Sequence, residues 1–92
     1  MKAKLLLEEK SEKVLEALAL PDLLRCIDIL NFLCDNPLGA QTAGFLKFPE
    51  MRRAVAGKYL IYYRHEPDMD QVRVYSIRHG SRLPPILKSL LP

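Results

Sequence analysis

A histidine between two arginines ends the last β-type stretch of the chain, in the segment RHGSR at residues 78–82. Positive charge beside His79 favours the neutral imidazole, which can act as a base or as a hydrogen-bond donor. Arginines can hold a phosphate group and stabilise the negative charge of a transition state. Together with a histidine that transfers protons, they would form the minimal set of groups that a ribonuclease requires. The candidate catalytic residues are Arg64, Arg78, His79 and Arg82. The alternative is that His79 and the second histidine, His65, are ordinary surface residues at strand ends.

Basic residues in the second half of the chain also form a candidate partner-binding surface. Arginines offer rigid bidentate forks to carboxylates or phosphates. The candidate partner-binding residues are Arg52, Arg53, Arg64, Arg73, Arg78, His79 and Arg82. The adjacent pair Arg52 and Arg53 is either a solvated face or a socket for an acidic partner peptide.

Four tyrosines, at positions 59, 62, 63 and 75, interleave with these arginines. Aromatic rings between cationic side chains can form a platform on which nucleic-acid bases stack. At β spacing, however, aromatic residues more often pack in a core or across strands. We therefore expect Tyr59 and Tyr63 to belong to the core.

Neither a metal site nor a cofactor site is predicted. No cysteine or histidine pair has the spacing of zinc ligands, and Asp68 with Asp70 offers too few oxygens for a calcium loop. Gly39 and Gly44 lack the companion glycines of a phosphate-binding loop.

The first half of the chain is predicted to be mainly helical. Apolar residues recur every three or four positions from about Glu9 to Asp35, which predicts helix. Pro21 interrupts this pattern, and because proline is tolerated at the first helical position, two helices that meet there are predicted. Pro37 pushes the residue before it out of the helical region and ends the second helix. Residues 2–7 are either a short edge strand or the lead into the first helix.

The second half of the chain, which carries the candidate residues, is predicted to form strands. Three β-type stretches lie at residues 51–56, 59–65 and 71–78, joined by a Gly-Lys turn and by a polar loop that contains proline. In the last stretch, strict alternation predicts one face with Val72, Val74 and Ser76, and the opposite face with Arg73, Tyr75 and Ile77. We expect residues 38–50 to be mostly loop and residues 83–92 to hold a last turn of helix. The predicted fold is α+β, with helices on one face of a three- or four-stranded antiparallel sheet.

Length and charge set further limits. At 92 residues the chain is expected to be one domain, residues 1–92. Residues 47–88 carry nine basic against four acidic residues, whereas residues 1–46 carry five against seven, so an electrostatic function belongs to the strand half. Cys26 and Cys34 lie eight positions apart on the predicted second helix. That is about 12 Å along the axis, too far for a disulfide. Free thiols and the lack of a long apolar run predict a cytoplasmic protein without a membrane partner.

The blocks MRRAVAGKYLIYYR and VRVYSIRHGSR together resemble the ParE/RelE superfamily of toxins from bacterial toxin–antitoxin modules, and the ParE-like branch more than the RelE branch. The features that carry the resemblance are Arg52 or Arg53 before a strand, YLIYYR at residues 59–64, the V-x-V strand at 72–77, HGSR at 79–82 and NPLG at 36–39. They cover about half of the chain.

The resemblance implies a growth-inhibiting toxin of the type II class, with an α+β fold, that a cognate antitoxin neutralises. ParE-type members of the family are associated with poisoning of DNA gyrase, and RelE-type members with ribosome-dependent cleavage of mRNA. The cleaving branch usually carries a tyrosine near its C-terminus, and no tyrosine follows Tyr75 here. The sequence therefore favours a non-catalytic toxin that binds gyrase. The alternatives are a RelE-type mRNA interferase that uses the candidate catalytic residues, and a degenerate relative without toxicity, which the short helical half would explain.

Overall fold

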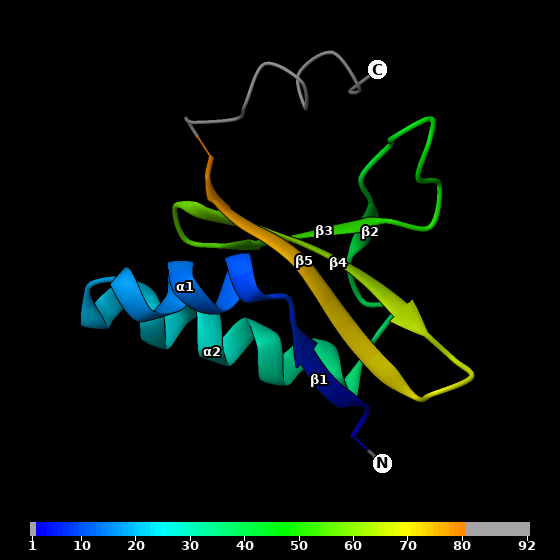
Figure 1. Cartoon of the computed structure of the whole chain (residues 1–92), viewed down its shortest axis with the longest axis horizontal. Helices are drawn as coiled ribbons and strands as arrows, with labels where there is room; N and C mark the ends of the chain where they lie inside the picture. The colour runs from blue at the N-terminus through cyan, green and yellow to red at the C-terminus, as the bar shows by residue number, and fades with distance from the viewer. Residues whose placement is uncertain (1, 81–92) are drawn as a thin grey trace.

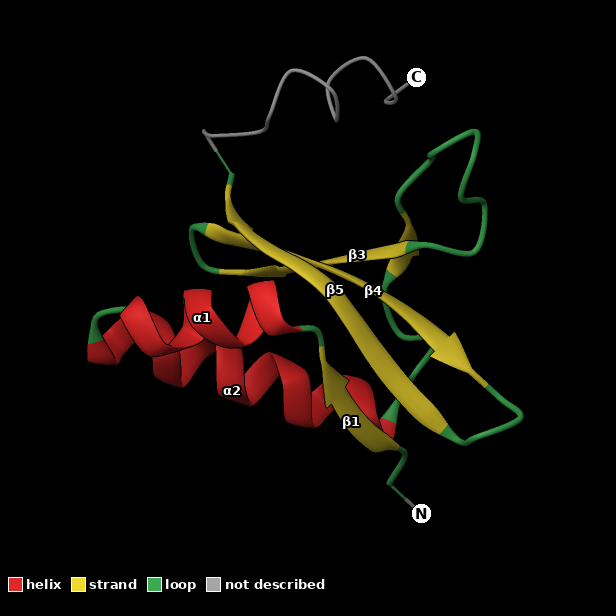
Figure 2. Ribbon diagram, in the orientation of Figure 1, coloured by secondary structure: helices red, strands yellow, loops and turns green. Residues whose placement is uncertain are grey.

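The structure of the chain is a computed structural model that describes residues 2–80. Its elements in chain order are β1 (Lys4–Leu7), α1 (Glu9–Ala17), α2 (Leu20–Asp35), β2 (Gln41–Thr42), β3 (Arg52–Ala56), β4 (Tyr59–Glu66) and β5 (Gln71–His79). Both helices lie on one face of the sheet (Figures 1 and 2), which confirms the predicted α+β class. The helical turn expected at residues 83–92 lies outside the described residues, as does Arg82.

The break between the two helices lies where the proline predicts it. Leu18 and Ala19 are extended, with ψ of 146° and 150°, and Pro21 stands in the first turn of α2. Proline is favourable there because the first N–H groups of a helix have no partner within the helix. Neither α1 nor α2 has the length and apolar character that crossing a membrane requires.

The sheet has five strands in the order β1-β5-β4-β3-β2. The strands β2 to β5 pair in antiparallel fashion, whereas β1 runs parallel to β5. The sheet is therefore larger than the expected three or four strands, and it is mixed. The sequence did not predict these two features, because a two-residue strand such as β2 has no periodicity to detect. The direction of β1 depends on a partner almost seventy residues away.

The face of the sheet that the helices cover, here called the inner face, holds the main core. Its strand residues are Ala54, Ala56, Ile61, Tyr63, Val72, Val74 and Ile77, and its helix residues are Leu15, Cys26, Leu30 and Leu33. Tyr63 is fully buried and donates a hydrogen bond of 2.8 Å to the carbonyl of Pro37, while Tyr59 packs against the edge of the core. The core positions expected for these two tyrosines are thus confirmed, and Cys26 and Cys34 are buried free thiols.

A β-bulge interrupts the pairing of β4 with β5. The register shifts between Tyr62 and Tyr63, which leaves Tyr75 without a partner on β4. Such a bulge reverses the alternation of side chains beyond it. Ile77 is therefore buried in the inner core, and Ser76 faces the opposite, outer face beside Tyr75. The facing that strict alternation predicted for Ser76 and Ile77 is wrong for this reason.

Candidate functional site

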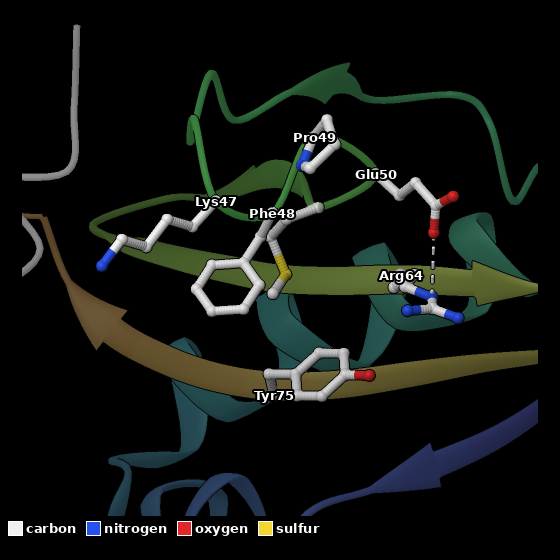
Figure 3. Close-up of a pocket in the computed structure, with 7 residues that line it drawn as sticks. Lys47, Phe48, Pro49, Glu50, Arg64 and Tyr75 are labelled. Carbon is white, nitrogen blue, oxygen red and sulfur yellow. Dashed lines mark ion pairs between the residues drawn. The ribbon is translucent and has the colours of Figure 1, made fainter.

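Two adjoining cavities lie on the outer face, between strands β4 and β5 and the loop that joins β2 to β3. Figure 3 shows the larger of the two. The larger chamber, of about 460 Å³, is lined by Lys47, Phe48, Pro49, Glu50, Met51, Arg64 and Tyr75. The smaller chamber, of about 150 Å³, is lined by Lys10, Phe45, Phe48, Met51, Tyr62, Tyr75, Ser76 and Arg78. Because Phe48, Met51 and Tyr75 line both, the two chambers form one site, here called the outer-face pocket.

The loop wall of this pocket is held in place by its base. The Ala43 N–H donates to the Met51 carbonyl at 2.8 Å, which closes the loop where it leaves β2 and enters β3. Phe45 is 4% exposed and stacks on Tyr62, with ring centroids 5.5 Å apart and planes 20° from parallel. Phe48, which extends from this anchored loop, keeps about half of its surface exposed. The loop therefore presents an aromatic ring from a fixed base.

The opposite wall of the pocket includes a residue from the first helix. Strand β1 pairs with β5 only as far as Val74. Beyond this point the start of α1 contacts β5 instead. The Glu8 N–H donates to the Val74 carbonyl at 3.0 Å, and the Ser11 hydroxyl donates to the same oxygen at 3.4 Å. This contact brings Lys10 to the smaller chamber. No local sequence pattern pointed to Lys10, because the β1–β5 pairing that places it there joins segments far apart in the chain.

Two of the candidate arginines meet at the outer-face pocket. The Nε of Arg64 lies 3.5 Å from a carboxylate oxygen of Glu50, and both side chains are well exposed, at 44% and 72%. Such an exposed ion pair contributes little and is easily exchanged for a ligand. Arg78 lines the smaller chamber, where its Nε is buried without a hydrogen-bond partner among residues 2–80. Both guanidinium groups can therefore bind an anion.

Arg73, by contrast, is already paired. Its Nη1 lies 2.8 Å from a carboxylate oxygen of Glu8, and its Nε lies 3.1 Å from one of Glu66. A hydrogen bond from Gln71, together with Arg73, holds the pKa of the Glu66 carboxyl below its usual value. The predicted binding residue Arg73 thus connects β5 to Glu8 at the start of α1 and to Glu66 at the end of β4, and it lies across the strands from Arg64.

The predicted pair Arg52 and Arg53 lies at the other edge of the sheet. Arg52 donates a hydrogen bond to the carbonyl of Ala40 and so fastens the segment that precedes β2. Strand β2 pairs only with these two arginines, so the outer edge of β3 beyond them has no strand partner in the described part of the chain. Beside it lies a groove of about 330 Å³, here called the edge groove. Its lining residues are Ile29, Phe32, Leu33, Gly39, Ala40, Gln41, Arg53, Ala54 and Val55.

The histidines do not join the arginines of the pocket. His79 pairs across the sheet with Tyr59, and their rings meet edge-on with centroids 5.4 Å apart. Because Tyr59 packs against the inner core, this imidazole lies on the face opposite to Arg78. His65 pairs with Val72, at the other end of β4. The structure therefore brings Arg64 and Arg78 to one pocket but separates His79 from them, and it describes no position for Arg82. Within residues 2–80, no three His, Cys, Asp or Glu side chains gather as metal ligands would.

Comparison with known proteins defines the class of this fold. No protein-family model matches the chain, and no curated protein sequence does. Solved structures of toxins do match. The toxin–antitoxin complex RelBE2 of Mycobacterium tuberculosis aligns with a TM-score of 0.77 and 16% identity, over 89% of this chain and 95% of that one. The isolated Escherichia coli RelE toxin aligns with a TM-score of 0.73 and 15% identity, over 95% and 94%.

An archaeal relative of this fold agrees with the two bacterial ones. The RelE–RelB complex of Pyrococcus horikoshii aligns with a TM-score of 0.70 and 15% identity, over 90% of this chain and all of that one. The two helices on a five-stranded mixed sheet therefore have the fold of RelE toxins.

Proposed function

We propose that this chain is the toxin of a type II toxin–antitoxin module and that it acts as a RelE-type mRNA interferase in the cytoplasm. The observation that carries this proposal is the outer-face pocket, where Arg64 and Arg78 line the walls together with the exposed ring of Phe48 and the half-buried ring of Tyr75. Cations that hold phosphates and aromatic rings on which bases stack are the combination that single-stranded RNA requires. The likeness to RelE structures supports the same function.

The chemistry that fits this pocket is transesterification of RNA. The 2′-oxygen of one ribose bonds to the adjacent phosphorus, the bond from phosphorus to the 5′-oxygen breaks, and the proton of the 2′-hydroxyl ends on that leaving oxygen. Negative charge grows on the phosphoryl oxygens during this step, and guanidinium groups fixed around it lower the barrier. In this proposal Arg78 holds the phosphate, and Arg64 contacts the same nucleotide from the adjoining chamber. His79 is not required, because it lies on the other face of the sheet, and Arg82 remains a sequence-based candidate.

The gyrase-directed alternative has less support. It rested on the ParE-like character of the YLIYYR and HGSR motifs. The solved structures described above are RelE structures, and the outer-face pocket suits a nucleotide better than a flat protein surface. A ParE-like toxin and a degenerate relative both remain hypotheses that the experiment below separates from the interferase.

Controlled induction in a bacterial host tests the proposal. Growth, bulk mRNA integrity and plasmid supercoiling are measured together after induction. We expect growth arrest with fragmented mRNA and normal supercoiling. Arrest with intact mRNA and altered supercoiling would favour a gyrase-directed toxin, and unchanged growth with normal amounts of folded protein would favour a degenerate relative.

We also propose that the edge groove is where the antitoxin binds. RelE–RelB complexes share this fold, and an unpaired strand edge beside an apolar groove is a surface to which an extended peptide can add as a further strand. Val55, at the centre of this edge, is 61% exposed, and Arg53 offers a cation to an acidic peptide. The predicted role of Arg53 in partner binding therefore has a specific place in this proposal, whereas Arg52 is held by Ala40.

The variant Val55→Pro tests this antitoxin site, because proline removes a backbone N–H and is poorly tolerated where a strand must pair on that side. The control is Val55→Thr, which keeps the backbone donor and the β-branched shape. We expect co-expression of the cognate antitoxin to rescue growth for wild type and for the threonine variant but not for the proline variant. Equal rescue of all three would place the antitoxin elsewhere.

A further inference from the structure

We infer that the outer-face pocket binds one nucleotide of single-stranded RNA as a unit, with its base against Phe48 and Tyr75 in the larger chamber and its phosphate in the smaller chamber. This inference rests on the proposed function, since it names the ligand of the same site. It goes further by giving Lys10 and the hydroxyl of Tyr62 a role in holding the phosphate, and Phe48 a role in stacking the base.

The smaller chamber is built for an anion. Lys10 and Arg78 supply positive charge from two different elements, and Ser76 adds a hydroxyl through the bulge in β5. Lysine and arginine are donors only, and a hydroxyl can donate as well. Within residues 2–80, no carboxylate lines this chamber. Its volume of about 150 Å³ is several times the roughly 30 Å³ that one water occupies in the liquid, which leaves room for a phosphate group.

Two buried polar atoms in this chamber have no partner within residues 2–80, the hydroxyl of Tyr62 and the Nε of Arg78. Tyr62 is only 2% exposed, so its hydroxyl has little access to bulk water. A buried polar group without a hydrogen bond costs about 1–3 kcal/mol, and native proteins retain few of them. A bound phosphate would accept a hydrogen bond from each of these two groups and so remove the cost.

The larger chamber is built for a base. Figure 3 shows the ring of Phe48 descending from the loop and the ring of Tyr75 lying along β5 beneath it. Stacking on an aromatic ring contributes about 1–3 kcal/mol per base and depends little on its identity. At the far end, Arg64 offers donors and Glu50 offers an acceptor to the edge of the base. The volume of about 460 Å³ lies within the ordinary range for small-ligand sites.

The shared lining makes the two chambers one binding unit. Phe48, Met51 and Tyr75 form the boundary, so a ligand that fills both must carry an anionic group directly beside a flat aromatic group. A nucleotide has this combination. Inorganic phosphate can fill only the smaller chamber, and a free base can fill only the larger one.

Binding of a dinucleotide that cannot be cleaved, because its first ribose carries a 2′-O-methyl group, tests the inference. The change in intrinsic tyrosine fluorescence of the purified chain reports the titration, and Tyr62 and Tyr75 are two of only four tyrosines in a chain without tryptophan. We expect Phe48→Ala and Tyr62→Phe each to weaken binding about tenfold, which corresponds to about 1.4 kcal/mol. Lys10→Met should weaken it by a similar factor, and inorganic phosphate should compete only weakly. The control Leu46→Ala alters a loop residue that is 86% exposed and lines neither chamber, so it should leave binding unchanged.

Each outcome decides something different. Tight binding that Phe48→Ala, Tyr62→Phe and Lys10→Met leave unchanged would overturn the inference, as would inorganic phosphate binding as tightly as the dinucleotide. Fragmentation of mRNA by wild type, with all three variants equally active, would overturn the inference and leave the proposed interferase intact. Dinucleotide binding with the expected losses, but intact mRNA in induced cells, would contradict the interferase and leave the nucleotide site standing.

Discussion

Two neighbouring tyrosines of β4 lie on opposite faces of the sheet and differ in how their hydroxyl groups are paired. On the inner face, the phenol of Tyr63 is fully buried and donates to the carbonyl of Pro37. One residue earlier, on the outer face, the phenol of Tyr62 is almost as buried and has no partner within residues 2–80. The Tyr63 hydroxyl thus stabilises the fold on the inner face, whereas the Tyr62 hydroxyl is available to bind a ligand on the outer face.

The arginines of the outer face show a similar contrast, although Arg64 and Arg73 pair directly across β4 and β5. Near the β4–β5 turn, Arg73 is fixed by Glu8 and Glu66 at 2.8 and 3.1 Å. At the pocket, Arg64 has only an exposed partner at 3.5 Å, and the Nε of Arg78 has none in the described part of the chain. Different residues therefore support stability and the proposed function. Substitutions in one set should change stability, and substitutions in the other should change activity.

The largest effect on stability is expected from the inner core. Leu33 is fully buried between α2 and the sheet. Leu33→Ala removes packed methyl groups and leaves a cavity, so the free energy of unfolding should fall by about 2–5 kcal/mol. Urea denaturation followed by circular dichroism measures it. A loss below about 1 kcal/mol would mean that the helices are packed less tightly on the sheet than the structure shows.

The next largest effect should appear in activity without a loss of stability. Arg78→Ala removes a cation from the outer-face pocket and, with it, a buried unpaired Nε. We expect mRNA cleavage to fall about a hundredfold, as when one group that stabilises a transition state is lost, while the denaturation midpoint stays the same or rises. Cleavage rates in a purified translation reaction and urea curves provide the two readouts. Full activity of this variant would place the chemistry elsewhere.

A matched pair of smaller substitutions sharpens the comparison of the faces. Tyr63→Phe deletes a hydroxyl that donates to Pro37 and should reduce the free energy of unfolding by about 1 kcal/mol. Tyr62→Phe deletes a hydroxyl without a partner in residues 2–80 and should be neutral or stabilising. Both are compared with wild type by urea denaturation without nucleotide. Equal losses for the two variants would show that the Tyr62 hydroxyl is not an unpaired group.

The smallest effect is expected in the dependence of stability on pH. The hydrogen bond from Gln71, together with Arg73, lowers the pKa of the Glu66 carboxyl in the folded protein. A lowered native pKa stabilises the fold at pH values above the unfolded pKa of about 4.3, and this contribution is lost as the pH falls through the native value. The stability difference between wild type and Glu66→Gln should therefore shrink between about pH 7 and pH 3. A stability difference between the two proteins that stays constant over this range would contradict the pairing of Glu66 with Gln71 and Arg73.

Much of the architecture could be predicted from local patterns. The apolar periodicity gave both helices, Pro21 gave the break between them, and the alternation in β4 placed Tyr59 and Tyr63 in the core. Arg64 and Arg78 were identified as functional candidates, and the structure places both in one pocket.

What could not be predicted depends on contacts between distant segments. The bulge that turns Ser76 outward arises from the register between two strands. Lys10 reaches the pocket only because β1 pairs in parallel with β5, and Phe48 belongs to a segment without periodicity that was expected to be mostly loop. His79 lies on the face opposite to Arg64 and Arg78 because adjacent strand residues point to opposite faces.

The measurement that tests the central claim most directly is mRNA cleavage by the purified chain in a reconstituted translation reaction. Wild type is compared with the double variant Arg64→Ala, Arg78→Ala, after urea curves have shown that both are folded. We expect wild type to fragment mRNA on translating ribosomes and the double variant to leave it intact. Intact mRNA with folded wild type, or cleavage by the double variant at the wild-type rate, would contradict the claim that the outer face acts on RNA.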